Sequence, residues 1–142
     1  MPSGELKYYL RNHYGIQRTA VTTSTDGGET WGEVTFDTEL IDPICQSSVV
    51  TYPDLGDGKV RVLFSNPADE KTRVKGTVRL SEDGGKTWPY SKVVEEGFYG
   101  YSCLTVLKNG EIGVLYERVY DYSDWNNMDI AFVKFSLDWF KS

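Results

Sequence analysis

Short runs in which hydrophobic and polar residues alternate follow one another along the whole chain, separated by Gly, Pro, Asp and Asn. Alternation with a period of two is typical of β-strands that bury one face. The pattern predicts ten strands, at residues 5–12, 18–24, 33–36, 46–52, 59–65, 74–81, 91–94, 101–107, 111–117 and 129–136. A helical period is visible only in one turn around residues 137–141. The chain is therefore expected to be all-β.

Turn residues separate these strands. They occur at residues 54–58, at Asn66-Pro67 and at residues 108–110. Two further turns, at residues 24–31 and 81–88, share the pattern S-x-D-G-G-x-T-W and begin 57 residues apart. Six shared positions in register indicate an internal repeat.

Folding alone explains every shared position of this octet. Gly accepts positive φ, and the Asp, Ser and Thr side chains can bond the amides of their own turn. The closing Trp is a large apolar anchor that can wedge between neighbouring sheets. The octet is therefore predicted to be structural, which keeps its carboxylates out of the active site. Its shared residues are Ser24, Asp26, Gly28, Thr30 and Trp31 in the first copy, and Ser81, Asp83, Gly85, Thr87 and Trp88 in the second.

A strand-rich repeat of this length is typical of propeller blades. Ten strands form roughly three four-stranded antiparallel units, of which the first and last are incomplete. A propeller needs at least four blades to close. Residues 1–142 are therefore expected to be one incomplete domain, either a piece of a propeller or a chain that another chain completes.

Composition limits the possible partners. The formal net charge is −6 and no basic block is present, which argues against nucleic acid. No run is long enough to span a membrane, and no segment resembles a signal peptide. Cys45 and Cys103 permit one disulfide, but their strand-like contexts favour two buried free thiols. The single histidine, His13, is interpreted as a loop residue, and no ligand spacing indicates a metal or another cofactor.

Packing of the fold does not readily account for the presence of four residues at their positions. Arg11 ends one predicted strand and Arg73 opens another, and a guanidinium can grip a carboxylate through two parallel hydrogen bonds. Tyr101 follows Gly100, which removes bulk and leaves room to approach the phenol. Glu117 follows a strand that is expected to be buried, where a carboxylate needs a partner. The alternatives are ordinary surface arginines and a core tyrosine.

The octets resemble the Asp boxes of sialidases (neuraminidases). From about Glu5 to Trp139, the order of motifs is similar to the C-terminal half of a bacterial-type exo-α-sialidase. That order is Leu10-Arg11-Asn12, Asp box, Pro43-Ile44-Cys45-Gln46-Ser47-Ser48, Ser65-Asn66-Pro67, Arg73, Asp box, Gly100-Tyr101-Ser102 and Leu115-Tyr116-Glu117. The resemblance implies part of a six-bladed β-propeller with its active site at the axis, on the face away from the Asp boxes.

The resemblance also implies roles for five residues. Arg11 and Arg73 match two members of an arginine triad that binds the carboxylate of sialic acid, and Tyr101 matches the tyrosine nucleophile. Glu117 matches the residue that orients the first triad arginine, and Gln46 lines the sugar pocket.

No residue here matches the family's aspartate acid/base, its activating glutamate or its first triad arginine. The chain alone is therefore expected to be inactive. The implied partners are sialylated glycans and either the missing N-terminal half or a second copy that covers open blade edges. The implied location is extracellular, cell-surface or periplasmic.

Other interpretations stay open at this stage. A non-catalytic Asp-box propeller that binds glycans or proteins predicts that Arg11, Arg73 and Tyr101 do not converge. A relative that keeps the pocket as a lectin is a third interpretation, and hydrolase and trans-sialidase activities share these motifs. The loop at residues 120–127 is expected to be solvated. Its aromatic residues are minor candidates for contact with the sugar beyond sialic acid, and Asp121, Asp124 and Asp129 are minor candidates for binding calcium.

Overall fold

The computed structural model describes residues 3–121, 123 and 125–142 and contains all ten predicted strands. The strands are β1 (Leu6–Leu10), β2 (Arg18–Ser24), β3 (Thr35–Ile41), β4 (Ser48–Thr51), β5 (Val62–Pro67), β6 (Val74–Ser81), β7 (Tyr90–Phe98), β8 (Ser102–Val106), β9 (Ile112–Val119) and β10 (Met128–Phe135). The predicted last turn is the 3₁₀ helix η2 (Leu137–Lys141), and a second one, η1 (Trp125–Asn127), precedes β10.

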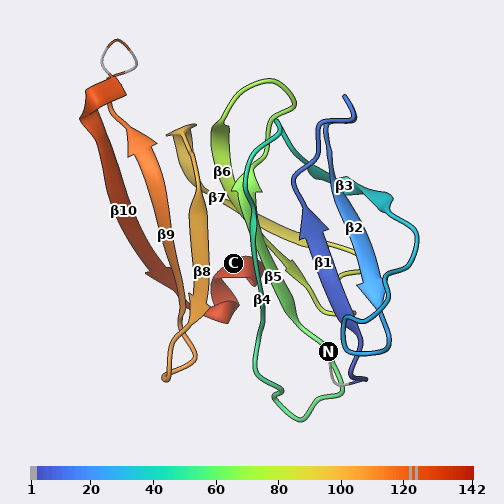
Figure 1. Cartoon of the computed structure of the whole chain (residues 1–142). Helices are drawn as coiled ribbons and strands as arrows, with labels where there is room; N and C mark the ends of the chain where they lie inside the picture. The colour runs from blue at the N-terminus through green and yellow to red at the C-terminus, as the bar shows by residue number, and fades with distance from the viewer. Residues whose placement is uncertain (1–2, 122, 124) are drawn as a thin grey trace.

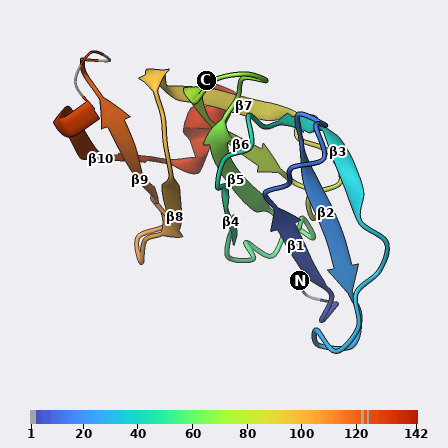
Figure 2. The same cartoon turned by 45° about the horizontal axis from the view of Figure 1, so that its top comes forward.

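The strands form three antiparallel sheets, with the orders β1-β2-β3, β4-β5-β6-β7 and β10-β9-β8. The four-stranded sheet lies between the two three-stranded sheets (Figures 1 and 2). The sheets do not close into a ring. This arrangement confirms the expected partial propeller with an incomplete first and last unit.

Hydrophobic side chains fill both interfaces between sheets. The larger core joins the four-stranded sheet to the sheet of β8, β9 and β10, and the smaller core joins it to the sheet of β1, β2 and β3. The larger core contains Tyr52, Leu63, Val78, Leu80, Tyr99, Leu104, Ile112, Val114, Tyr116 and Phe140. The smaller one contains Leu40, Val62, Phe64 and Trp88, with Tyr9 packed against it.

The registers place the two Asp boxes at one end of the sheets. Leu6 pairs with Ser24, which opens the first box, whereas Leu10 pairs with Ala20 near the other end. In the next sheet, Val62 pairs with the Ser that opens the second box. The loops that carry the candidate residues lie at the end opposite the boxes (Figure 1).

Both Asp boxes make the hydrogen bonds expected of them. The Ser24 hydroxyl donates to Asp26 Oδ1 at 2.7 Å and accepts the N–H of Gly28 at 2.9 Å. The corresponding bonds in the second box, from Ser81 to Asp83 and from Gly85 to Ser81, measure 2.7 and 2.8 Å. The repeat in the sequence is therefore a repeat of one turn geometry.

The two box tryptophans have different surroundings. Trp88 is buried between two sheets, where its indole N–H donates to Asp37 Oδ2 at 3.0 Å. Trp31 is 43% exposed and lies beside Tyr8, with 5.5 Å between ring centroids. The prediction that the closing tryptophan packs between neighbouring sheets is therefore correct for Trp88 alone. No described sheet covers the outer side of the first sheet, where Trp31 lies.

Tertiary contacts change three predicted boundaries. β3 runs on to Ile41, which pairs with Arg18 of β2, and its Asp37 and Glu39 side chains accept the indole and backbone N–H groups of Trp88. The strand predicted at 91–94 extends over Tyr90–Phe98, with register shifts opposite β6. The predicted turn at Asn66-Pro67 is wrong, because both residues lie in β5. The buried Asn66 amide donates to the carbonyl of Ile41, and Pro67, which lacks an N–H, ends the strand.

The cysteine prediction is partly wrong. Both thiols are free, but only Cys45 is buried and Cys103 is exposed. Cys103 lies in β8, and its side chain is on the face of that sheet that no described element covers. His13 lies in the loop between β1 and β2, as predicted. In the part of the chain that the structure describes, no helix is long and apolar enough to cross a membrane.

We predict that Asp83→Asn destabilises the protein by about 1–3 kcal/mol at pH 7, because it removes the charge that several hydrogen bonds share. Desolvation alone would raise the pKa of Asp83, but bonds from Thr87 and Ser81 outweigh it and hold the pKa well below its usual range. Such a carboxylate stabilises the fold above its unfolded pKa of about 3.9 and loses this effect as the pH falls. The difference from the unmutated protein should therefore shrink below about pH 4.

Urea unfolding followed by tryptophan fluorescence at several pH values measures this difference. Asp54→Asn is the control, because Asp54 caps one exposed turn through a single bond from Gly56 N–H, which Asn can also accept. Equal losses for both variants would contradict the prediction, as would a pH-independent effect of Asp83→Asn.

Candidate functional site

Tyr101 lies immediately before β8 and is clamped by the end of β9. Its N–H donates to Glu117 Oε2 at 2.9 Å, and its carbonyl accepts the N–H of Glu117 at 3.0 Å. The N–H of Gly100 donates to the carbonyl of Glu117 at 2.9 Å. Three bonds between two short segments therefore fix the backbone from which the phenol projects.

This clamp requires a glycine at position 100. A Cβ on Gly100 would collide with the Glu117 carboxylate and approach the Phe98 ring. The space that a side chain at position 100 would fill is thus occupied by Glu117. The sequence interpretation, in which Gly100 leaves room to approach the phenol, stays a prediction.

Gln46 clamps the same segment from the other side. Its Oε1 accepts the N–H of Ser102 at 2.9 Å, and its Nε2 donates to the carbonyls of Ser102 and Ser47 at 3.0 and 2.8 Å. The amide of Gln46 is therefore occupied with backbone groups next to Tyr101. Gln46 also lines the cavity beside the phenol.

Arg11 and Arg73 both reach Tyr101. Arg11 Nη1 donates to the Tyr101 hydroxyl at 3.4 Å, and the Arg73 guanidinium carbon lies 5.3 Å from the centre of the Tyr101 ring. Arg11 follows β1, Arg73 precedes β6 and Tyr101 precedes β8, so each of the three sheets contributes one residue. The structure thus brings together three side chains that the sequence separates by up to 90 positions.

Tyr99 and Tyr101 are two residues apart but differ in environment. Tyr99 is fully buried, and its hydroxyl lies 2.6 Å from Ser65 Oγ. Burial raises the pKa of Tyr99 to about 12. Tyr101 is 43% exposed and flanked by two cations. Of the two phenols, only Tyr101 is both accessible and next to groups that can hold an anionic ligand.

A buried turn under the site contains a residue that the sequence analysis missed. Asp42 is 2% exposed, and its Oδ1 accepts the N–H of Cys45 at 2.8 Å. The Cys45 thiol in turn packs against the carbonyl of Gly100 at 3.7 Å. Burial raises the pKa of both Asp42 and Cys45, and the positive charge of Arg11 opposes both shifts. In the sequence, the Asp-Pro pair at residues 42–43 is a turn signal that could have drawn attention to Asp42.

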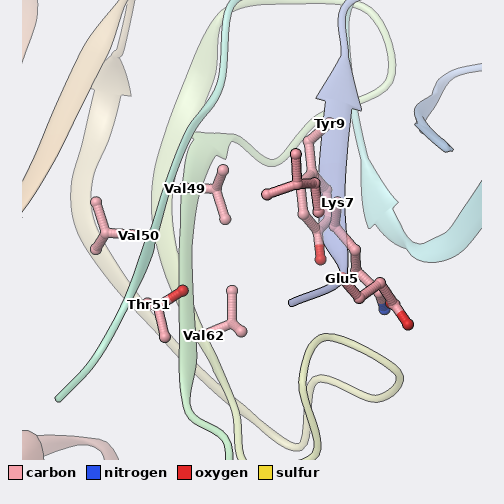
Figure 3. Close-up of a pocket in the computed structure, with 8 residues that line it drawn as sticks. Glu5, Lys7, Tyr9, Val49, Val50, Thr51 and Val62 are labelled. Carbon is pink, nitrogen blue, oxygen red and sulfur yellow. The ribbon is translucent and has the colours of Figure 1, made fainter. Parts of the chain in front are cut away.

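An open cavity of about 400 Å³ lies beside Tyr101. Its lining residues are Gln46, Tyr101, Ser102, Cys103, Leu115, Tyr116, Glu117 and Ile130. A second cavity, of about 230 Å³, lies away from Tyr101 between β1 and the strands β4 and β5 (Figure 3). Tyr101 lines the first cavity and also contacts both Arg11 and Arg73.

The loop before β10 supplies little to this site in the residues that are described. Tyr120 is exposed and stacks on Arg118, whose guanidinium carbon lies 3.9 Å from the ring centre. The candidates Tyr122 and Asp124 lie outside the described residues, as does the side chain of Trp125. In residues 3–121, 123 and 125–142, no group of three or more His, Cys, Asp or Glu is placed to hold a metal ion.

We predict that Gly100→Ala lowers the free energy of unfolding by about 1–3 kcal/mol, because the new methyl group displaces the Glu117 carboxylate. The Tyr101 N–H loses its acceptor, so its amide hydrogen should exchange faster. Gly32→Ala is the control, because its nearest neighbour is the Thr23 carbonyl at 3.4 Å and a methyl group fits there. The two variants are compared by urea unfolding and hydrogen exchange, and equal behaviour would contradict the clamp.

Comparison with known proteins shows the family to which the chain is similar. Residues 1–114 match the family of BNR repeat-like domains. A sialidase of Micromonospora viridifaciens is 42% identical over 129 residues, which are 88% of this chain and 18% of that protein. An anhydrosialidase of Macrobdella decora is 34% identical over 151 residues, which are 92% of this chain and 18% of that protein.

Solved structures give the same result. The intramolecular trans-sialidase of Ruminococcus gnavus, solved with oseltamivir carboxylate, matches with a TM-score of 0.82 and 37% identity over 100% of this chain and 32% of that one. The chain thus spans about a fifth to a third of the length of these relatives. Its sequence, its repeat and its fold agree, and the chain belongs to the sialidase family of BNR-repeat proteins.

Proposed function

We propose that this chain is the C-terminal half of an exo-α-sialidase propeller and supplies the tyrosine nucleophile and two arginines of its active site. The substrates are glycoconjugates that end in sialic acid, and the reaction is hydrolysis with retention of configuration. The location expected from the resemblance, outside the cytoplasm, is where such substrates are exposed. The convergence of Arg11 and Arg73 on the accessible Tyr101 carries this proposal.

The arginines suit the charge of the substrate. Sialic acid bears a carboxylate on its anomeric carbon, and a planar guanidinium binds a carboxylate through parallel charge-assisted hydrogen bonds. Arg11 and Arg73 approach Tyr101 from two different sheets, so a carboxylate that bridges them would bring the anomeric carbon close to the phenol. Positioning of this kind contributes to catalysis by holding reactants in an attacking geometry.

The same carboxylate explains why the nucleophile is a phenol. A carboxylate nucleophile, which most retaining glycosidases use, would approach this anomeric carbon against like charge, and sialidases with a tyrosine are an exception to that scheme. The Tyr101 oxygen attacks the anomeric carbon as the leaving group departs. Water then displaces the phenol, so that two inversions give net retention.

Other groups of the reaction are expected in the preceding part of a longer protein. A phenol needs a base at neutral pH and the leaving group needs an acid, and in the family a glutamate and an aspartate serve these purposes. Glu117 is proposed to orient the first triad arginine as well as to clamp Tyr101. The chain is similar both to sialidases and to intramolecular trans-sialidases. Analysis of the products of the longer protein distinguishes transfer of the sialic acid from its hydrolysis.

We predict that the 142-residue chain does not hydrolyse a fluorogenic sialoside but binds free sialic acid through its carboxylate. Titration with sialic acid should shift the NMR signals of Arg11, Arg73 and Tyr101. Arg73→Lys keeps the charge but loses the planar fork, so binding should weaken about tenfold. Tyr101→Phe should leave this binding largely intact.

Sialic acid methyl ester is the matched ligand control, because it lacks the charge that the arginines hold. Equal binding of the acid and the ester would contradict the assigned arginine role. Turnover by the isolated chain at a rate near that of intact sialidases would contradict the assignment of essential groups to another segment.

We also predict that the isolated chain self-associates. Leu6, Tyr8 and Trp31 are exposed on the outer side of the first sheet, and Leu115, Ile130 and Phe132 on that of the last. Open apolar faces and strand edges of this kind favour association. Light scattering at increasing concentration should show a dimer or larger assembly, and a monomer throughout would contradict this prediction.

A further inference from the structure

Arg18 opens β2 at the end of the sheets opposite the Asp boxes, and the first sheet holds its side chain. Its Nε donates to the carbonyl of Thr38 in β3 at 3.0 Å, and its Nη1 donates to the carbonyl of Gln17 at 2.6 Å. The side chain is 28% exposed. Backbone groups of the first sheet therefore set the position of this guanidinium.

The same guanidinium reaches the second sheet. Nη1 of Arg18 donates to Glu70 Oε1 at 2.8 Å. Glu70 belongs to residues 68–73, which join β5 to β6 at the end opposite the Asp boxes and which we call the β5–β6 loop (Figure 1). An exposed ion pair usually contributes little, because ordering two long side chains costs entropy. Here that cost is reduced, because backbone carbonyls already order Arg18.

The main chain of Arg18 holds the segment that carries Arg11. The carbonyl of Arg18 accepts Nδ2 of Asn12 at 2.8 Å. Asn12 is 7% exposed and directly follows Arg11. Arg18 thus contacts the segment of one site arginine through its main chain, and the loop that ends in the other, Arg73, through its side chain.

Two further contacts order the β5–β6 loop from within the second and third sheets. Asp69 Oδ1 accepts the N–H of Thr72 at 2.8 Å. The carbonyl of Arg73 accepts the N–H of Tyr99 at 2.8 Å. Neither contact involves the first sheet. The ion pair of Glu70 therefore adds a connection between this loop and the sheet that carries Arg11.

We propose that Arg18 and Glu70 are positioning residues of the sialidase site, and we call their ion pair the Arg18–Glu70 latch. The latch sets the separation of the Arg11 and Arg73 guanidinium groups, and with it the site for the carboxylate of sialic acid. The inference rests on the proposed function. A carboxylate that both arginines bind tolerates little change in their separation, because hydrogen bonds weaken steeply outside a narrow range of distance and angle.

The charge of Glu70 distinguishes the latch from a general electrostatic effect. A carboxylate near an anion-binding site repels the anion. By that effect alone, removal of Glu70 leaves the binding of sialic acid unchanged or strengthens it. If Glu70 acts through Arg18, its removal weakens binding instead. The direction of the change therefore identifies the mechanism.

Glu70→Ala is compared with the unmutated 142-residue chain by NMR titration with free sialic acid. Binding should weaken about threefold, the size expected for loss of an exposed ion pair. Adding Glu70→Ala to Arg18→Met should cause no further loss, because the latch is then already open. The NMR order parameters of the Thr72 and Arg73 amides should fall in the Glu70→Ala chain, because the loop has lost its connection to the first sheet.

Glu111→Ala is the matched control. It removes the same charge and an ion pair with Lys134 of 3.0 Å, at the end of the sheets away from Tyr101, so it should change neither measurement. Binding by the Glu70→Ala chain that equals or exceeds that of the unmutated chain would overturn the proposal. An equal loss in the Arg18→Met background, or unchanged order parameters, would do the same.

The order parameters are measured without a ligand, so the latch and the proposed function can fail separately. If the unmutated chain does not bind sialic acid, the assigned arginine role fails, and the Thr72 and Arg73 amides alone decide whether the latch holds the loop. If Arg18→Met does not fold, the direction of the Glu70→Ala effect and the order parameters still decide the proposal.

Discussion

The reciprocal clamp between residues 100–101 and Glu117 is the constraint on which the site depends. Two backbone bonds and one carboxylate bond join the start of β8 to the end of β9. Gln46 holds the next residue from the opposite side. Because the main chain is held at both flanks, the backbone from which the Tyr101 phenol projects is fixed relative to the sheets. From there the phenol reaches both Arg11 and Arg73.

The arrangement of the sheets makes this meeting possible. Each sheet contributes one of the three side chains from the end opposite the Asp boxes. The boxes close the other end with short hydrogen bonds from Ser and Thr to Asp, and the second box also joins two sheets through Trp88. A change in a box is expected to act on folding, whereas a change at the opposite end, such as Gly100→Ala, acts on the position of Tyr101 as well as on folding.

The first and last sheets show how the chain relates to a larger ring. Residues that are buried in the middle sheet have exposed counterparts in the first one. Phe64 is fully buried, whereas Tyr8, which occupies the corresponding register position, is 57% exposed. The same contrast separates Trp88 from Trp31. These differences arise from the neighbours of each sheet, because the compared positions correspond in register.

The sequence by itself determined the number and order of the strands, the repeat and the hydrogen bonds of the Asp boxes, because alternation and turn chemistry are local. It also singled out Arg11, Arg73 and Tyr101, since their motifs stand in the order typical of sialidases. Only the tertiary structure decided that the three meet, that Glu117 fills the space beside Gly100, and that Asn66-Pro67 continues a strand. Asp42 was missed and Cys103 was misplaced for the same physical reason. The environment of a side chain is set by segments far away in the sequence, and local patterns contain no information about which segments those are.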